Sequence, residues 1–514
     1  MTKRALIALL FAGAALISGV TLLEGVQPND EGLMLQAAAR IADGQVPYRD
    51  FWWFYPPGQP YLLGGLWELF GPSLLTWRIL RVLCDATVAV LAWMLARRGG
   101  ASERLALAAW LTAALAMAYP SGPHPFPPTL AMCLGALLLM EDRPALAGTL
   151  GGLAALWRIE FAAYLGLGVL IAFALRPGPR DDRLRPALRF AGCALAVAAV
   201  LYIPVIAAAG LGDSFDLLIR YPLEDFSEYQ SLPFPLDYDG ALNTSSIGGF
   251  LNDSAESLLV FYLPLALVLG VVSALVALGL RFRRESWWQA AAAVFAIGMA
   301  HYLITRPDVF HTAPLAVMVA VLTTWAVAAR RDVRIARQAV LAAAAVAVFA
   351  VAYATVEGLD RRWLELRADR VALDLPGADG VRVREDTATP LERTVRFVQR
   401  RTGRGEPIYV ATRRSDLVTA GAPLLYVLAD RPNPTRYDIA APGVVTTEPV
   451  QREIVADLKR SRVRTVVRWI DPVSAAPEPN KAGESSGVTL LDDYLANAYR
   501  RLKSFGDYVL LERR

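Results

Sequence analysis

Long apolar runs recur through the first two thirds of this sequence, and they restrict its fold more than any other feature. Each of about eleven runs is a candidate for the roughly 20 helical residues that cross the hydrocarbon core of a bilayer. A mean hydropathy of +0.36 over 514 residues is also too apolar for a soluble protein of this length. We therefore expect a polytopic α-helical membrane protein. The expected spans lie near residues 5–23, 72–96, 104–119, 127–140, 145–157, 160–175, 190–209, 257–280, 287–304, 312–329 and 338–356.

The first apolar run has a second interpretation, because Lys3 and Arg4 precede it as basic residues precede the apolar core of a signal peptide. No A-x-A pattern stands at its end, and the further spans give the run an obvious role as the first membrane helix. We expect a membrane helix, with a signal peptide as the alternative.

The basic residues of the loops predict an orientation, because positively charged flanks stay on the cytoplasmic side of a membrane. With the N-terminus inside, the cytoplasmic loops are short and basic, as at Arg97-Arg98 and between residues 180 and 189. The loops between spans on the other side hold few arginines, namely Arg40, Arg49, Arg158, Arg220 and Arg306. We expect a multi-pass protein of the bacterial cytoplasmic (inner) membrane with a cytoplasmic N-terminus and an extracytoplasmic C-terminal region.

Three segments on the outer side are too long or too polar to be simple turns: residues 24–71, 210–256 and 357–514. The last has the composition of a globular protein and alternating helix and strand patterns. Helices are expected near residues 390–398, 450–458 and 490–499, and strands near 408–412, 463–470 and 508–511. We therefore expect a transmembrane domain over residues 1–356 and a soluble extracytoplasmic α/β domain over residues 357–514.

The first outer loop, at about residues 24–71, carries the most informative chemistry. Asp30 and Glu31 stand just beyond the first span, at the start of an expected helix. A carboxylate beside a helix N-terminus can stay ionised and accept a proton from a hydroxyl nucleophile. Helix capping is the competing interpretation, and it is compatible with catalysis. Arg49, Asp50 and Tyr55 are further candidates, in and beside an aromatic cluster that suits the membrane interface.

The order of these features resembles the GT-C class of membrane glycosyltransferases. The likeness rests on one membrane helix, the outer Asp30-Glu31 pair, a helix, the G-x-x-P-Y-R-D-F motif at residues 44–51, and Pro-Pro-Gly at residues 56–58. It is closest to the bacterial family-39-like branch related to protein O-mannosyltransferases and lipid A aminoarabinose transferases. The resemblance implies a polyprenyl-phosphate sugar donor, with Asp30 matching the catalytic aspartate and Glu31 its neighbour. It is strong over residues 1–100, good for the layout to residue 356 and weak in the tail.

Two further groups of polar residues fall on the outer side of the later spans. Arg158 and Glu160 interrupt the fifth and sixth spans, where ionised groups usually face a cavity or each other. Arg306, Asp308 and His311 lie between the ninth and tenth spans, where an ordinary polar turn is the competing interpretation. An arginine can offset the charge that develops on a leaving phosphate. Arg306 is the first candidate for binding the donor phosphate, and Arg158 is the second.

Several other patterns have simpler interpretations. Arg78, Arg81 and Asp85 share one side of the second span, and we expect an Arg81–Asp85 pair within the helix. The three cysteines lie in apolar runs without metal-ligand spacing, and no H-E-x-x-H pattern indicates a zinc hydrolase. A divalent cation such as Mg²⁺ or Mn²⁺ is an open alternative near the acidic pairs, although the spacing does not require one. A net charge of only +4 gives no support for nucleic-acid binding.

These observations predict an inverting glycosyl transfer at the outer face of the membrane, with Asp30 as the general base. The expected partners are a polyprenyl-phosphate sugar donor, membrane lipid, and a glycan, lipid or protein acceptor. Two alternatives remain open. A transporter or flippase would use the intramembrane charges as a permeation path, and a non-catalytic component of envelope polysaccharide assembly would not need Asp30 and Glu31.

Overall fold

The chain forms two compact units that interleave in the sequence. The computed structural model describes residues 2–118, 125–234, 245–246, 255–279, 284–328, 338, 345, 367 and 369–514. We call the first unit, which takes in Met1–Thr21, Ile79–Tyr202 and Pro233–Leu366, the helical unit. The second, the mixed unit, takes in Leu22–Arg78, Ile203–Leu232 and Arg367–Arg514.

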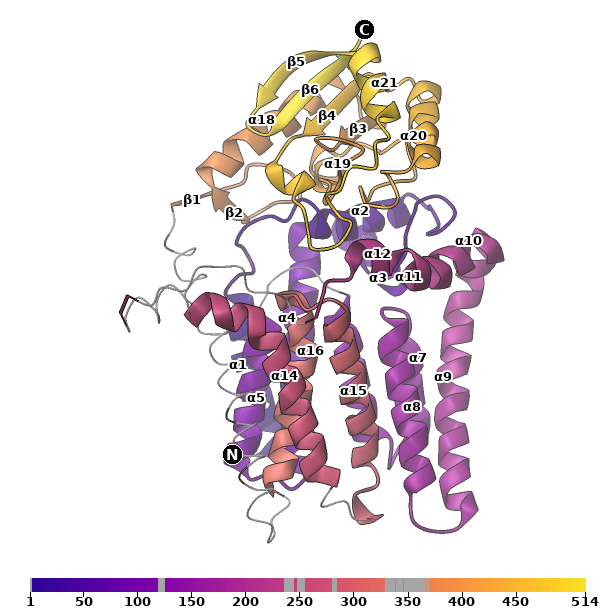
Figure 1. The fold of residues 1–514 in the computed structure, drawn as a ribbon, viewed down its shortest axis with the longest axis vertical. Coiled ribbons are helices and arrows are strands. Elements are labelled where there is room, and N and C mark those ends of the chain that lie inside the picture. The colour runs from indigo at the N-terminus through magenta and orange to yellow at the C-terminus, as the bar shows by residue number, and fades with distance from the viewer. Residues whose placement is uncertain are drawn as a thin grey trace. The chain divides into compact units, whose positions relative to one another are not determined.

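Apolar helices make up the described part of the helical unit, and two of them, α4 and α9, continue into the mixed unit (Figure 1). Each of the first ten expected spans corresponds to a helix, and residues 338–356 fall almost wholly outside the described residues. By length and composition, four helices of the described chain are suited to crossing a membrane: α4, α9, α14 and α16. The helices are α1 (Lys3–Gly19), α4 (Leu74–Arg98), α5 (Glu103–Ala118), α6 (Phe126–Leu139), α7 (Pro144–Ala154), α8 (Ile159–Leu175), α9 (Arg180–Ala209), α14 (Ala255–Gly279), α15 (Gln289–Thr305) and α16 (Val309–Ala328).

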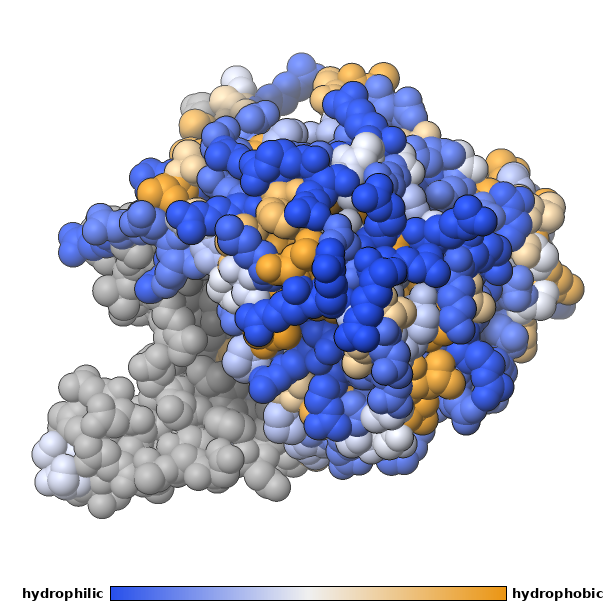
Figure 2. Space-filling view, turned by 90° about the horizontal axis from the view of Figure 1, so that it is seen from above, coloured by the Kyte–Doolittle hydropathy of each residue, from blue (hydrophilic) through white to orange (hydrophobic). Residues whose placement is uncertain are grey.

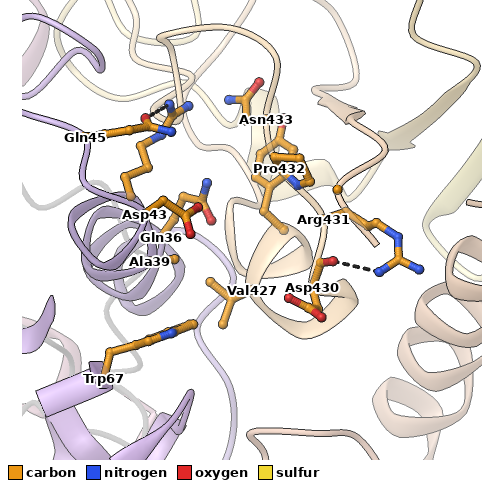
Figure 3. A pocket seen from close by; sticks show the side chains of 13 residues that line it. Gln36, Ala39, Asp43, Gln45, Trp67, Val427, Asp430, Arg431, Pro432 and Asn433 are labelled. Atoms are coloured by element: carbon orange, nitrogen blue, oxygen red, sulfur yellow. Dashed lines mark hydrogen bonds between the residues drawn. The ribbon is translucent and has the colours of Figure 1, made fainter. Parts of the chain in front are cut away.

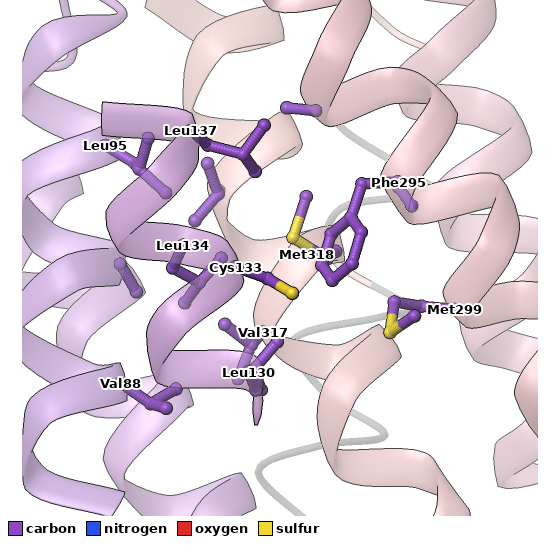
Figure 4. Packing of buried hydrophobic residues seen from close by; sticks show 14 of the residues in the cluster. Val88, Leu95, Leu130, Cys133, Leu134, Leu137, Phe295, Met299, Val317 and Met318 are labelled. Atoms are coloured by element: carbon purple, nitrogen blue, oxygen red, sulfur yellow. The ribbon is translucent and has the colours of Figure 1, made fainter. Parts of the chain in front are cut away.

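Small residues let these helices pack closely. A Cβ added at Gly168 of α8 would lie 2.6 Å from the Ala291 carbonyl oxygen of α15, and one at Gly298 would lie 2.2 Å from the Tyr164 ring. Glycine and alanine at helix contacts bring backbones together where lipid supplies no hydrophobic drive for association. A large cluster of apolar side chains fills the core beside them, and the buried Cys133 lies among leucine, methionine and Phe295 side chains (Figure 4). All three cysteines are free; Cys133 is buried, whereas Cys84 and Cys193 are partly exposed.

A cluster of buried polar side chains, Ser18, Arg81 and Asp85, lies within this interior. Arg81 Nε lies 4.0 Å from Asp85 Oδ2 on the next turn of α4, so the predicted pair within the helix is confirmed. The Ser18 hydroxyl of α1 donates to the same carboxylate at 2.6 Å, a partner that the sequence did not indicate. Because an isolated charge in an apolar interior is costly, pairing and hydrogen bonding make Asp85 tolerable there.

The mixed unit gathers parts of the three polar segments that the sequence assigns to one side of the membrane. The sequence predicts a separate domain for the tail. In the structure, the compact unit that holds the tail also takes in residues 22–78 and 203–232. Its first segments form short helices. These are α2 (Asp30–Ala42), α3 (Gly58–Phe70), α10 (Leu211–Phe215), the π-helix η1 (Asp216–Arg220), α11 (Tyr221–Glu224) and α12 (Phe226–Gln230).

A four-stranded sheet forms the centre of the tail, with the order β3-β4-β6-β5. β3 (Ile408–Ala411) and β4 (Thr465–Trp469) are parallel, and β6 (Tyr508–Arg513) pairs antiparallel with β4 and with β5 (Tyr499–Phe505). Around it lie α18 (Glu385–Arg401), α19 (Leu424–Ala429), α20 (Glu448–Arg460), α21 (Leu490–Ala498) and the hairpin of β1 (Arg370–Ala372) and β2 (Arg382–Arg384). The face of the molecule in Figure 2, which includes this region, is mostly hydrophilic, with apolar side chains in small separate patches.

The expected helices and strands of the tail are present, and the errors concern short elements. The helix expected to reach residue 499 ends at Ala498, because Tyr499 begins β5. This edge strand reads Tyr-Arg-Arg-Leu-Lys-Ser-Phe, and its charged residues hide the alternation that identifies a strand.

In the first outer loop, the sequence does not predict helix α3, because Gly64 and Gly65 weaken its helical propensity.

An apolar stripe runs along the consecutive helices α10, η1 and α11. Its members recur at four-residue spacing and are 37% to 75% exposed: Leu211, Phe215, Ile219 and Leu223. The opposite side is buried, where the Tyr221 ring meets the Trp52 ring with centroids 5.0 Å apart. An amphipathic helix of this kind lies in the plane of the membrane interface. The candidate span α9 ends at Ala209, directly before α10, so we expect the stripe to contact lipid.

Two neighbouring positions test this expectation. In a background with the native cysteines replaced by alanine, Leu223→Cys should react with a membrane-impermeant maleimide at least tenfold more slowly than Glu224→Cys. Both native side chains are exposed in the protein alone, so lipid is the source of the expected difference. Labelling is measured in lipid nanodiscs, and equal rates for the two thiols would refute a lipid-facing stripe.

Candidate functional site

Asp30 is the first residue of α2, and its side chain is exposed. The amide of Asn29 donates to Asp30 Oδ1 at 2.9 Å, while Asn29 Oδ1 accepts from the backbone N–H of Gly421 at 3.0 Å. The predicted helix start is therefore correct, but Asn29 caps no helical N–H with its side chain. Its amide instead links the tail to Asp30 and restricts the orientation of that carboxylate.

Glu31 is the neighbour of Asp30 in sequence but has a different environment. Its carboxylate is 2% exposed and forms a two-pronged ion pair with Arg78, with Nε–Oε1 at 2.6 Å and Nη2–Oε2 at 2.9 Å. Arg78 also donates to the carbonyl oxygens of Leu22 and Gly25, at 3.0 and 2.7 Å. Successive helical residues point about 100° apart, so one side chain lies at the surface and the other inside. Glu31 thus fixes the start of α2.

Close backbone contact holds α2 against the tail. A Cβ at Gly32 would lie 2.2 Å from the backbone nitrogen of Leu424, and that nitrogen donates to the Pro28 carbonyl oxygen at 3.1 Å. Near the other end of α2, the buried Arg40 pairs with Asp438 through contacts of 2.5 and 2.9 Å. The helix that begins at Asp30 is therefore attached to the tail at both ends.

A cavity of about 410 Å³ adjoins Asp30 within the mixed unit. Residues 26–30 line it together with tail residues that include Asp386, Trp469 and Tyr508. This volume is within the range of small-molecule sites. Among the described residues, no group of three or more His, Cys, Asp or Glu side chains could hold a metal ion, so we assign no metal ligands.

The other candidates in the first loop shape that loop. Arg49 pairs with Asp50 at 2.7 Å and donates to the Ala208 carbonyl oxygen at 3.3 Å. The hydrogen bond from Arg49 holds the pKa of Asp50 below its usual value, against a smaller opposing effect of burial. The Tyr55 carbonyl oxygen accepts from the Tyr48 hydroxyl at 2.9 Å, and the Tyr55 ring packs against Phe54.

In the helical unit, the predicted polar residues form two ion pairs. Arg158 Nε lies 2.9 Å from Glu160 Oε1, and Arg306 Nε donates to Asp308 Oδ2 at 2.8 Å. His311 Nδ1 is 2.5 Å from the other oxygen of Asp308. Burial alone would raise the pKa of Asp308, but the hydrogen bond and charge of His311, with the charge of Arg306, lower it.

Tyr302 connects these two pairs. The Arg158 guanidinium lies over its ring at 5.0 Å from the centroid, and the ring of His311 lies 4.6 Å from it on centroids. The sequence did not single out Tyr302, because one tyrosine in an apolar helix gives no functional signal. The helical unit thus brings Arg158, Glu160, Arg306, Asp308 and His311 together, whereas Asp30, Glu31, Arg49, Asp50 and Tyr55 belong to the mixed unit.

Comparison with solved structures defines the class of fold. The chain has the GT-C fold expected from its sequence, because it matches crystal structures of ArnT from Cupriavidus metallidurans over 99% of its length and 98% of theirs. The TM-score is 0.53 with the structure of ArnT bound to undecaprenyl phosphate and 0.51 with the apo structure, at 15% identity in both cases. No family model and no curated protein sequence matches the chain.

The contact between Gly32 and the tail can be tested with two matched glycines. Gly32→Ala should lower the stability of the protein by about 1–3 kcal/mol, because the added methyl group has no room beside Leu424. Gly65→Ala is the control: it is also helical, and nothing lies within 4 Å of its added Cβ. The control should be neutral or stabilising by up to about 1 kcal/mol. Thermal unfolding in detergent measures both, and equal stability of the two variants would contradict the docking.

Proposed function

We propose that this protein is a membrane glycosyltransferase that moves a sugar from a polyprenyl-phosphate donor to an acceptor hydroxyl at the outer face of the membrane. The observation that carries the proposal is the GT-C fold over 99% of the chain, together with an exposed aspartate at the expected position of the catalytic group. One of the similar structures is of ArnT bound to undecaprenyl phosphate, which supports a polyprenyl-phosphate donor.

In the proposed reaction, Asp30 is the general base. The acceptor hydroxyl loses its proton to the Asp30 carboxylate, and its oxygen attacks the anomeric carbon from the side opposite the phosphate. The bond between that carbon and the phosphate oxygen breaks, so that polyprenyl phosphate leaves and the configuration inverts. Two features support this role: the side chain is exposed beside a 410 Å³ cavity, and Asn29 restricts its orientation. Glu31 then acts by positioning α2.

Arg306 and Arg158 are proposed to bind the donor phosphate. Each guanidinium is held by a carboxylate, Asp308 or Glu160, and the Arg306 and Arg158 side chains are only 18% and 14% exposed. An arginine fixed in a site with little water stabilises a developing phosphate charge strongly. The acceptor is a glycan, lipid or protein that presents a hydroxyl.

The two neighbouring carboxylates provide the sharpest test. Asp30→Asn should fold normally and lose at least 100-fold in transfer of labelled sugar from polyprenyl phosphate, because an amide cannot accept the proton. Glu31→Gln should lose about 3 kcal/mol of stability, because it leaves the buried Arg78 without its counter-charge. Thermal unfolding and transfer are measured on the same purified samples.

The matched control is Asp493→Asn, which changes an exposed aspartate in the first turn of α21 in the same unit. It should retain wild-type transfer. Wild-type turnover by Asp30→Asn would refute the base assignment. Movement of the lipid-linked sugar without any covalent product would instead identify a flippase. A normal phenotype of Asp30→Asn/Glu31→Gln, together with no transfer by the wild-type protein, would favour a non-catalytic assembly role.

The proposed phosphate contacts predict a kinetic effect on the donor. Arg306→Ala should lower kcat/KM for the polyprenyl-phosphate sugar at least 100-fold, because it removes a charge-assisted contact with the leaving phosphate. Arg185→Ala removes an exposed, ion-paired arginine from the same helical unit and should have little effect. Steady-state kinetics with varied donor measure both, and equal kinetics for the two variants would rule out the Arg306 assignment.

A further inference from the structure

A second cavity, of about 210 Å³, lies within the mixed unit between α2, α3 and α19 (Figure 3). Helix α2 contributes Gln36 and Asp43, which is its C-cap, α3 contributes Trp67, and Asp430 follows the end of α19. The cavity is distinct from the one beside Asp30, with which it shares no lining residue. The proposed transfer reaction does not use it.

A rigid network fixes one hydrogen-bond donor in this cavity. Arg40 donates to both oxygens of Asp438 and to the Thr435 carbonyl oxygen, and its remaining terminal nitrogen donates to Gln45 Oε1 at 2.8 Å. Because the oxygen of the Gln45 amide is thus oriented toward Arg40, its NH₂ group is the part left to donate elsewhere. Arg431 does not serve the cavity, since its guanidinium points away from it in Figure 3.

Two carboxylates add hydrogen-bond acceptors to the lining, Asp43 beside α2 and Asp430 across the cavity (Figure 3). The carboxylate of Asp43 accepts no hydrogen bond and forms no ion pair with any described side chain, although it lines the cavity. Partial burial of this exposed residue raises its pKa above the usual value, the charge of Arg40 opposes this, and the charges of Asp430 and Glu68 add to it. Asp430 has a left-handed backbone, with φ 53°, which carries its side chain into the lining. Its carboxylate pairs with Arg404, at 3.4 Å on the surface.

An aromatic surface completes the lining. Trp67 is half-buried, and in Figure 3 its indole extends from α3 toward Val427, below the polar groups of α2. A flat apolar ring beside acceptors and a donor matches a sugar, which has an apolar face of C–H groups and a rim of hydroxyls that both donate and accept. At roughly 30 Å³ for each water, the cavity holds about seven water volumes, which suits one saccharide unit better than a longer ligand.

We propose that this cavity is a binding site for one neutral saccharide unit, which stacks on Trp67 and hydrogen-bonds to Asp43, Asp430 and Gln45. Asp43 follows Asp30 by thirteen residues on α2, so at 1.5 Å per residue the two carboxylates are about 20 Å apart along the helix. A sugar bound here is therefore remote from the unit that would react at Asp30. Combined with the proposed function, this favours a glycan as the acceptor, held at a second point along its length.

Binding can be measured without the transfer reaction. The full-length protein in nanodiscs is examined by saturation-transfer difference NMR with methyl glycosides of glucose, galactose, mannose and N-acetylglucosamine as probes. At least one probe should bind, and Trp67→Leu and Asp43→Asn should each weaken that binding at least tenfold. Binding should also weaken as the pH falls through the pKa of Asp43, since the protonated carboxyl loses acceptor capacity.

Two control variants separate this cavity from other surfaces. Tyr61→Leu removes another aromatic side chain from α3, and Asp493→Asn removes an exposed carboxylate elsewhere in the unit; both should bind the probe as the wild type does. Asp43→Asn keeps the test valid if Trp67→Leu fails to fold, because the Asp43 carboxylate has no hydrogen bond or ion pair to lose among the described residues. Failure of all four probes to bind, or binding that survives both variants, would overturn the proposal. Binding of Ca²⁺ or Mg²⁺ through Asp43 in place of any sugar would overturn it as well.

This outcome is separate from that of the proposed function. If the protein binds a methyl glycoside at Trp67 but transfers no sugar, the saccharide site stands and the proposed function fails. If it transfers sugar but binds none of the probes, the proposed function stands and the saccharide site fails.

Discussion

The docking of one short helix, α2, on the tail is the contact on which the mixed unit depends. Gly32 brings the backbones of α2 and α19 together so closely that no larger residue fits, and the buried Arg40–Asp438 pair holds the other end. Helix α2 alone would be marginal, because 13 residues form few helical hydrogen bonds against the cost of nucleation. Its conformation is therefore set by tertiary contacts, and the tail becomes part of the candidate site through them.

The two ion pairs of α2 act through specificity more than through net stabilisation. A buried ion pair roughly balances the loss of hydration against the attraction of its charges, but it strongly penalises any arrangement that leaves one partner alone. Glu31 and Arg40 therefore select one register for α2 against Arg78 and Asp438. The buried Glu31 and the exposed Asp30, adjacent in sequence, therefore have different surroundings. Glu31 holds the helix in place, and Asp30 is left exposed beside a cavity.

The sequence predicted the parts of the fold that depend on local pattern. Apolar runs predicted ten helices of the helical unit. In the tail, strand patterns predicted β3, β4 and β6, and helical spacing predicted α18, α20 and α21. The resemblance in the first loop directed attention to Asp30. The sequence also placed residues 24–71, 210–256 and 357–514 on one side of a membrane, and parts of all three segments share one compact unit.

The sequence could not predict the contacts that give these residues their roles. Nothing local indicates that Gly32 meets Leu424, that Asn29 bonds to Gly421, or that Arg78 bonds to Glu31 in preference to a residue of its own helix. Each is a long-range contact whose partner is one of many similar residues. Asn29 is the clearest case. Its type and position indicate a helix cap, yet the tail supplies a backbone N–H that engages its side-chain oxygen.

Because such long-range contacts are not visible in the sequence, residue type alone does not separate candidate catalytic groups from structural groups. Asp30, Glu31, Arg40 and Asp43 all lie on or next to one helix, and their residue types alone assign no roles. Burial and partners separate them: Glu31 and Arg40 are enclosed by opposite charges, while Asp30 and Asp43 are exposed and line two different cavities. Residues of the tail contribute to the lining of both cavities, so each cavity depends on the docking of α2 against the tail. Contacts with the tail thus place this short surface helix beside two cavities.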